Sequence, residues 1–201
     1  MSAEHLSSQF DDKVLSAQSS FRAIMDATAR PGRIHRIAPT AEAPAPMMRA
    51  TAALAQALFD HDTPIWLDAT MRGNGDAGRW LRFHTGAPLT SDAGQAEFAL
   101  IGDVAALPAL ETFALGSSEY PDRSTALVVQ IRSFNDGPAF ELKGPGIDGS
   151  IVAQADAGLS DLFEQLAANA RTFPRGIDVV LVADDAILAI PRSTRLRAME
   201  G

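Results

Sequence analysis

The chain contains no cysteine among its 201 residues. This absence excludes a disulfide framework, a thiolate zinc site, an iron–sulfur cluster and a thiol nucleophile. Lysine is nearly absent as well, because 15 of the 17 basic residues are arginine and the only lysines are Lys13 and Lys143. Arginine presents a rigid planar fork that suits carboxylate and phosphate, whereas lysine is the residue that forms Schiff bases. Covalent chemistry through an amine therefore has few candidates.

The sequence also lacks a positive net charge and a long apolar run. The formal net charge is −8 at pH 7, so there is no net attraction to nucleic acid or to anionic lipid. Nowhere do about 18 apolar residues run together, as a membrane-spanning helix requires. The start, MSAEHLSSQFDDK, has no apolar signal core. We expect a cytoplasmic protein with neither a nucleic-acid nor a membrane partner.

The chain length indicates one domain over residues 1–201, because it is enough for one well-buried core and short for two domains of typical size. Within it, the polar residues 1–13 are expected to form a flexible N-terminal arm. The only low-complexity segment is a short Pro/Ala-rich link, APTAEAPAP, at residues 38–46.

Helical patterns recur along the chain. Residues 16–30 carry apolar side chains at helical spacing before a Pro-Gly stop, and Phe21 and Ile24 are expected to pack this helix onto the body. Residues 46–62 are rich in strong helix formers. A third helix is predicted around Trp80 to His84, and a fourth, amphipathic one over 159–171.

Strand patterns lie between and after these helices. Short strands are predicted within 32–38, 63–69 and 97–102, and the dense apolar run at 127–131 is expected in the middle of the sheet. Residues 139–147 are predicted to pair with that run as an antiparallel hairpin across FNDGP, and 177–184 with 186–191 as a second hairpin. Val179 and Leu181 should lie inside the sheet. The fold class predicted is α/β, with a mixed sheet flanked by helices.

One glycine pattern tests a nucleotide-binding interpretation. GNGDAG matches G-x-G-x-x-G with Gly73, Gly75 and Gly78, which in a dinucleotide-binding fold cradle a pyrophosphate. In that fold the first glycine comes directly after a strand, but here DATMR intervenes. An ordinary loop is therefore favoured over a dinucleotide site, and no P-loop pattern is present.

Metal and nucleophile patterns are weaker still. The four histidines are scattered without an H-x-x-x-H pair, although His61 and Asp62 could form a local clamp. There is no G-x-S-x-G elbow for a serine nucleophile. A pyridoxal enzyme would depend on Lys143, which precedes Gly-Pro-Gly and is expected to face solvent at a strand end. We expect neither a metal nor a cofactor.

Polar residues at the ends of apolar elements are the remaining candidates. The segment FPRGIDVVLVADDAILAIPRST sets an aspartate, Asp178, at the start of an apolar strand between two Pro/Arg corners. Taken one at a time, these polar residues are best explained as turns and helix caps. Taken together, they suggest guanidinium groups and a carboxylate that converge on a phosphate-bearing ligand or on a polar protein interface. The candidate catalytic residues are Arg82, His84, Asp178 and Arg192, and the anion-binding candidates are Arg123, Arg175 and Ser193.

Seven blocks in order carry a family resemblance. SFRAIMDATARPG, DTPIWL, LRFHTGAPL, YPDRSTALVVQI, LKGPGI, FPRGIDVVLV and AIPRST resemble the PhnH family, a component of the bacterial carbon–phosphorus lyase system for phosphonate use. The resemblance extends from about Phe21 to Thr194. One departure is Ser193, where the family often has threonine; the hydroxyl is retained.

The resemblance implies a homodimer with a fold like the large domain of pyridoxal-phosphate-dependent transferases, without their cofactor site. It implies a transferase reaction that joins a phosphonate such as methylphosphonate to the ribose C1 of ATP and expels adenine, giving ribose 1-methylphosphonate 5-triphosphate. The implied partners are PhnG, PhnI, PhnJ and PhnL subunits. Clustered arginines would offset the repulsion between the two anionic substrates, and a carboxylate would steady an oxocarbenium-like ribose.

Three hypotheses follow from the sequence. In the first, which we favour, the chain is an accessory subunit whose surfaces assemble the complex. In the second, Arg82, His84, Asp178 and Arg192 converge and contribute directly to the active site. The third, a nicotinamide-dependent oxidoreductase, rests on GNGDAG alone.

Overall fold

In the computed structural model, residues 3–38 and 43–199 are described, and the side chains of residues 3–14 and 157 lie outside the described part. The helices in that part are α1 (Ala3–Ala29), α2 (Arg49–Leu58), α3 (Ala69–Arg72), α4 (Asp76–Thr85) and α5 (Ser160–Asn169). The strands are β1 (His35–Arg36), β2 (Ile65–Leu67), β3 (Leu89–Thr90), β4 (Phe98–Ile101), β5 (Ala126–Gln130), β6 (Ala139–Lys143), β7 (Ile151–Gln154), β8 (Asp178–Ala183), β9 (Ala186–Ile190) and β10 (Arg195–Ala198).

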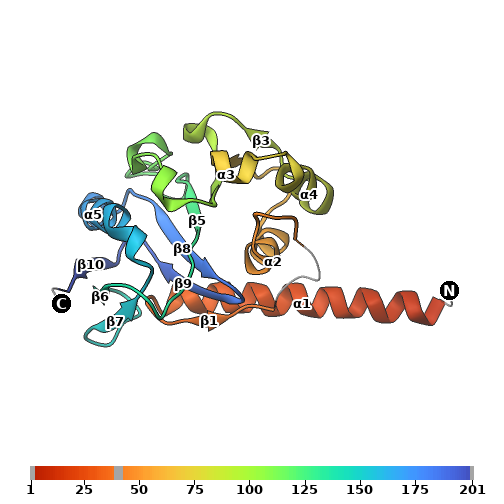
Figure 1. Ribbon diagram of the computed structural model, residues 1–201, viewed down its shortest axis with the longest axis horizontal. Helices are drawn as coiled ribbons and strands as arrows, with labels where there is room; N and C mark the ends of the chain where they lie inside the picture. Colours follow the sequence, from red (N-terminus) through yellow and green to blue (C-terminus); the bar gives the residue numbers. More distant parts are fainter. Residues whose placement is uncertain (1–2, 39–42, 200–201) are drawn as a thin grey trace.

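A seven-stranded mixed sheet, in the order β1-β9-β8-β5-β4-β2-β3, organises the molecule (Figure 1). The strands from β3 to β8 in that order run parallel, and β9 and β1 are antiparallel to their neighbours. The prediction of an α/β fold with a mixed, helix-flanked sheet is confirmed. The dense apolar run at 127–131 supplies β5, which lies in the middle of the sheet as predicted, between β4 and β8.

Side chains alternate between the two faces of this sheet, because successive residues of a strand point to opposite sides. In β8, Val179 and Leu181 contribute to one hydrophobic cluster, and Val180 and Val182 to the other. Both Val179 and Leu181 are buried, as predicted. With apolar side chains on both faces, the strand requires a cover on each side.

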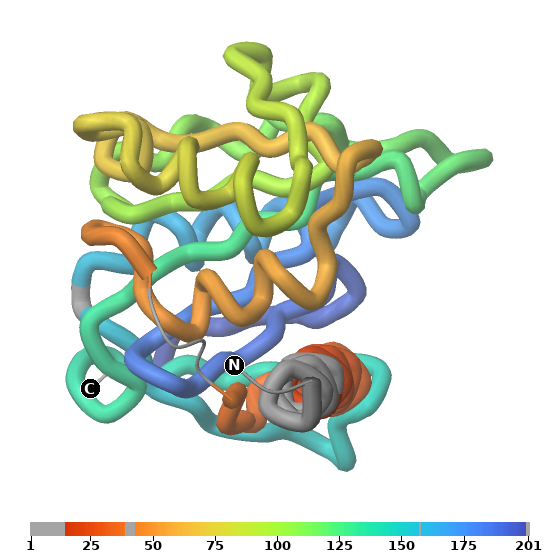
Figure 2. Tube along the Cα trace, turned by 90° about the vertical axis from the view of Figure 1, so that its right-hand side faces the viewer, coloured from red at the N-terminus to blue at the C-terminus, as the bar shows by residue number. Residues whose placement is uncertain are grey.

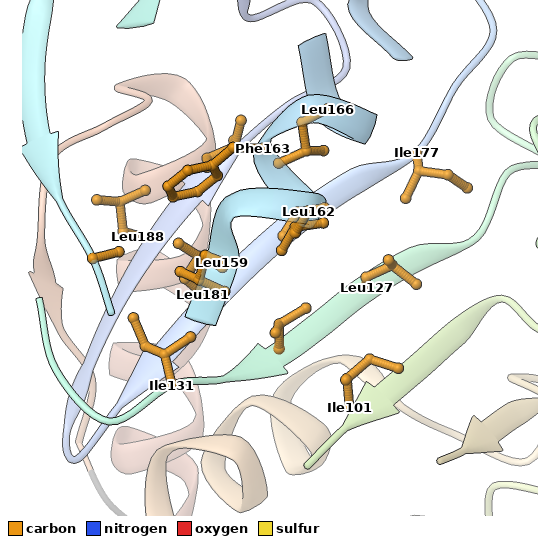
Figure 3. Close-up of a cluster of buried hydrophobic side chains, with 14 of the residues drawn as sticks. Ile101, Leu127, Ile131, Leu159, Leu162, Phe163, Leu166, Ile177, Leu181 and Leu188 are labelled. Carbon is orange, nitrogen blue, oxygen red and sulfur yellow. The ribbon is translucent and has the colours of Figure 1, made fainter. Parts of the chain in front are cut away.

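Helix α5 covers the first face (Figure 3). Its buried apolar side chains are Leu162, Phe163 and Leu166, and Leu159 joins them from the residue before the helix. They pack against β5 and β8, where Leu127 and Leu181 are fully buried. Each such side chain contributes about 1.5–3 kcal/mol when fully buried. The amphipathic helix predicted over 159–171 is therefore confirmed.

Helices α1, α2 and α4 cover the second face. Figure 2, which looks nearly along α1, shows α2 beside it. Helix α2 contributes a row of small buried side chains that ends in Leu54 and Ala55. Helix α4 packs Ala77 and Leu81 into the same cluster, and α1 contributes Ile24. Small side chains allow α2 to lie close to the sheet.

The predicted hairpin between 127–131 and 139–147 is wrong. β6 does not pair with β5; it is the middle strand of a separate three-stranded antiparallel sheet, in the order β10-β6-β7. β5 already has parallel partners on both sides, which leaves no free edge for β6. The inward face of the small sheet, with Phe140, Leu142 and Leu196, packs into the first cluster. The second predicted hairpin, β8 with β9, is confirmed.

Helix α1 differs from the helix predicted over residues 16–30 in its length and in the side that is buried. It begins at Ala3, although residues 1–13 were predicted as an arm, and the flexibility of that arm is not tested because its side chains lie outside the described part. Ile24 is buried as predicted, but Phe21 is 46% exposed, so the expectation that Phe21 packs onto the body of its own chain is wrong. The Pro/Ala-rich link includes residues 39–42, which also lie outside the described residues.

None of the described helices is long and apolar enough to cross a membrane.

Candidate functional site: an arginine-rich end of the sheet

Asp178 and Arg192 form an ion pair at the amino end of the parallel strands. Asp178 is the first residue of β8, and Arg192 follows the end of β9, so the β8–β9 hairpin brings the two together. The guanidinium Nε of Arg192 lies 3.1 Å from both carboxylate oxygens of Asp178, and Nη2 also bonds to the carboxylate. The backbone N–H of Arg192 donates to the same carboxylate at 2.7 Å. The charge at the start of the apolar strand is therefore paired.

The same guanidinium reaches the segment before β5. Nη2 donates to the Ser124 hydroxyl at 2.6 Å, and Nη1 donates to the carbonyl oxygen of Pro121. The side chain of Arg192 is only 14% exposed. Arg192 thus links the start of β8, the end of β9 and the segment before β5. Since Nε and Nη2 are engaged and Nη1 is partly so, Arg192 has little capacity left to bind a ligand anion.

The three anion-binding candidates lie on loops near the same end but differ in surroundings. Arg123 stacks over the Tyr120 ring, with the guanidinium carbon 4.3 Å from the ring centre. Arg175 is exposed in the turn that leads into β8, and Ser193 is half-buried next to Arg192. The turn before β8 is bonded to the segment before β5, because the Gly176 N–H donates to the carbonyl of Leu115 at 2.8 Å. Their convergence on one anion and their role in binding stay predictions.

Arg82 and His84 lie elsewhere, in the last turn of α4. Both are exposed; His84 Nδ1 lies 3.5 Å from the Gln56 amide, and its ring stacks on Trp80 at 4.3 Å. Helix α4 packs over β2 and β3, and β2 is three strand spacings from β8, or about 14 Å. Within one chain the structure therefore does not bring these two residues to the Asp178–Arg192 pair. Their participation in catalysis stays a prediction.

The carboxyl end of the parallel strands, where open α/β sheets usually bind ligands, is occupied by the chain's own side chains. Asp68, after β2, is 1% exposed and accepts three backbone N–H groups, from Met71 at 2.7 Å, Gly102 at 2.8 Å and Asp103 at 2.9 Å. Sequence reasoning missed this residue, although an aspartate directly after the strand IWL is a signal for a helix cap.

Gln130 has a similar role at the end of β5. Its carbonyl oxygen accepts the backbone N–H of Met48 at 2.6 Å and the Thr51 hydroxyl at 2.8 Å, and its amide donates to Pro46. The N-terminus of α2 is thereby bonded to an internal side chain. The N-termini of α2 and α3, which elsewhere in such sheets could bind phosphate, both have internal partners here.

The glycine pattern GNGDAG connects two helices. Gly73 ends α3 and Gly75 precedes α4, so neither glycine follows a strand. Gly78 lies inside α4, where an added Cβ would meet Leu89 at 2.9 Å. Asp76 occupies the first turn of α4 and pairs with Arg79. The loop interpretation is confirmed, and the geometry of a dinucleotide fingerprint is absent from this segment.

The local predictions for histidine and lysine are confirmed in geometry. His61 Nε2 lies 3.3 Å from the Asp62 carboxylate, with both side chains largely exposed. Lys143 is exposed at the end of β6 and bonds to Glu141 at 3.0 Å. This hydrogen bond, with a second from Ser150, lowers the pKa of Glu141 below its ordinary value. Among the described residues no group of three or more His, Asp or Glu side chains is placed to hold a metal ion.

These features define a class: an α/β protein with a mixed sheet, a carboxyl end closed by its own side chains, and an arginine-rich amino end. Comparison with known proteins agrees with the blocks noted in the sequence. The family model of the bacterial phosphonate metabolism protein PhnH matches residues 8–197. The chain therefore belongs to the PhnH family.

Two relatives extend this assignment. The alpha-D-ribose 1-methylphosphonate 5-triphosphate synthase subunit PhnH of Rhizobium meliloti (strain 1021) is 47% identical over 191 residues, which cover 94% of each chain. The putative C-P lyase subunit protein HtxG of Stutzerimonas stutzeri is 29% identical over 179 residues, or 89% of this chain and 85% of the relative.

Proposed function

We propose that this chain is a subunit of an α-D-ribose 1-methylphosphonate 5-triphosphate synthase in the carbon–phosphorus lyase system, and that it acts in phosphonate catabolism. The observation that carries the proposal is the 47% identity to the Rhizobium meliloti subunit along nearly the whole of both chains. The reaction transfers the ribose 5-triphosphate of ATP to a phosphonate and expels adenine; it is carried out with PhnG, PhnI and PhnL subunits in the cytoplasm. The chain also belongs to a complex with PhnJ. The isolated chain is expected to lack this activity.

We further propose that the chain's contribution is assembly rather than chemistry. Asp178 and Arg192 are bonded to each other and to neighbouring segments, and two helix N-termini at the carboxyl end have internal partners. We also propose that the fold resembles the large domain of pyridoxal-phosphate-dependent transferases without their cofactor site; the closed carboxyl end supports the absence of that site.

One surface supports contact with another chain. An open groove of about 380 Å³ runs between α1 and α2, and Phe21 and Arg22 line it. On the adjacent α4, Phe83 is 84% exposed. The three helices are neighbours, because Gln56 of α2 lines the groove and also lies beside His84 of α4. Exposed apolar groups gathered on one face are typical of interaction sites. We call Phe21, Met25, Gln56 and Phe83 the helical face, and propose that it meets a neighbouring subunit, a second copy of the chain included.

Co-expression with the partner subunits tests the proposal. The wild-type chain should co-purify with them in a complex that makes ribose 1-methylphosphonate 5-triphosphate, detected by ³¹P NMR, and omission of the chain should abolish product. Phe83→Asp should reduce the yield of complex, or convert a dimer of the isolated chain to a monomer, without loss of thermal stability. If Phe83→Asp leaves both unchanged, the helical face is not the interface.

Variants of Arg82 and His84 distinguish a role in assembly from a direct role in catalysis. Both are exposed, so Arg82→Ala and His84→Ala should fold normally and, on the assembly view, support full turnover in the complex. A complex that assembles at normal yield but loses turnover with either variant would establish a direct active-site contribution. Arg192→Ala is unsuitable for this comparison, because the bonds that it removes are expected to lower stability as well.

A further inference from the structure

A cavity of about 510 Å³ opens between the C-terminal end of α5 and strand β10. Ala167 and Ala170 form one side, Leu196 contributes from β10, and Arg171 and Arg195 complete the lining. Its volume lies in the range of small-molecule sites, roughly 300–1,000 Å³. Neither the predicted catalytic residues nor the predicted anion-binding residues line it.

Both arginines are free to bind. Arg171 and Arg195 are exposed, and neither has an ion pair or side-chain hydrogen bond with any described residue. Among the residues that the structure describes, no acidic side chain lines the cavity. In a chain with net charge −8, two guanidinium groups without a carboxylate make a local cationic site. Arg192, by contrast, is paired with Asp178.

The register of the small sheet sets Arg195 beside another basic residue. Arg195 lies directly opposite Lys143 on β6, so the two side chains project from the same face. Like charges directly opposite each other destabilise a strand pair. The Lys143 ammonium is engaged by Glu141, while Arg195 has no such partner. A bound anion at Arg195 would relieve this repulsion.

The exposed edge of β10 supplies a backbone donor. β10 is the outer strand of its sheet and pairs only with β6. Met199 donates to Ala139 at 3.0 Å, so residues 195, 197 and 199 form the hydrogen-bonded pairs of this register. By alternation, the N–H of Leu196 points away from β6 toward the outer edge, where Leu196 lines the cavity. An amide N–H next to a residue that carries a guanidinium group suits an oxyanion.

We propose that Arg171, Arg195 and the N–H of Leu196 form a binding site for the phosphate-type oxyanion of a small ligand. The guanidinium forks bind two oxygens each, and the alanines and Leu196 accept the apolar part of the ligand. The site is independent of the proposed complex, because it depends only on residues of this chain. The same chemistry occurs in inorganic polyphosphate and in a nucleotide, and the probes below separate them.

Isothermal titration calorimetry on the full chain tests the site with inorganic pyrophosphate, ATP and methylphosphonate as separate probes. We expect saturable one-to-one binding of at least one probe, and at least tenfold weaker binding to Arg171→Ala/Arg195→Ala. ATP binding with no pyrophosphate binding would indicate a nucleotide; equal binding of both would indicate the phosphate group alone.

Arg197→Ala is the matched control, because Arg197 is exposed on the same strand and does not line the cavity. It should bind the probe as the wild type does, and all variants should keep the wild-type melting temperature. Two results would overturn the site: no binding of any probe at millimolar concentration, or an equal loss in Arg197→Ala and in the double variant. Because calorimetry needs no partner subunit, its outcome is separate from that of the co-expression experiment.

Discussion

Replacement of Arg192 by alanine is the sharpest test of how the amino end of the sheet is held. The change removes the side-chain hydrogen bonds to Asp178, Ser124 and Pro121. The backbone N–H of residue 192 still donates to the Asp178 carboxylate. Breaking a fully buried ion pair costs about 3–5 kcal/mol. Asp178 is 36% exposed and can regain water, so we expect a smaller loss of about 2–3 kcal/mol in the free energy of unfolding.

Thermal and urea unfolding measure this loss. For a chain of this size, the melting temperature should fall by roughly 4–12 °C. Arg192→Lys, which keeps the charge but loses the planar fork, should cost about 1–2 kcal/mol. A double-mutant cycle with Asp178→Asn should give a coupling energy of about 1–2 kcal/mol. If Arg192→Ala unfolds within about 0.5 kcal/mol of wild type, as a surface variant such as Arg197→Ala should, the pair does not hold the strand ends and the reasoning is refuted.

Two further predictions concern the hydrophobic core and the loss of stability at low pH. Leu181 is fully buried, so Leu181→Ala should lower the free energy of unfolding in urea by about 2–4 kcal/mol. Phe21 is exposed, so Phe21→Ala should lower it by less than about 1 kcal/mol in the isolated chain. Equal losses would contradict the assignment of Leu181 to the core and of Phe21 to the surface. The hydrogen bond from Arg132 lowers the pKa of Asp156 to about 2, so this carboxylate contributes stability that is present above its unfolded pKa of about 3.9 and is lost as pH falls toward 2. Arg132→Ala should raise the Asp156 pKa in an NMR titration and flatten the pH dependence of stability in that window; an unmoved pKa would argue against the pairing.

Local periodicity was sufficient for most of the elements. The sequence predicts the positions of α2, α4 and α5, of β2 and β4, and of the β8–β9 hairpin. Each of these depends on neighbouring residues, through helical spacing, strand alternation or a tight turn at Asp184 and Asp185. The short strands β3, β7 and β10 were not predicted. Two to four residues carry too little periodicity to be recognised without their partners.

Pairing between distant segments was not predictable in the same way. The Phe-Glu-Leu-Lys segment alternates as a hairpin strand should, yet it pairs with β7 and β10 because β5 has partners on both edges. Phe21 continues the apolar pattern of α1 but lies outside the buried stripe, a distinction that depends on which side of the helix meets the sheet. Asp68 carries the local signal of a helix cap, but its bonds to Gly102 and Asp103, like the role of Gln130, appear only when distant strand ends meet.

The sequence by itself determined the class of chemistry available, the α/β character, the family, and the positions of most helices and strands, because these depend on composition, local spacing and a series of blocks along the chain. Only the tertiary structure decided which charged side chains are held in ion pairs and which are available to bind a ligand. Arg192 and Arg195 are three residues apart, yet one is bonded to Asp178 and the other lines an open cavity. That difference arises because ion pairs depend on contacts across the fold, which the order of residues along the chain does not specify.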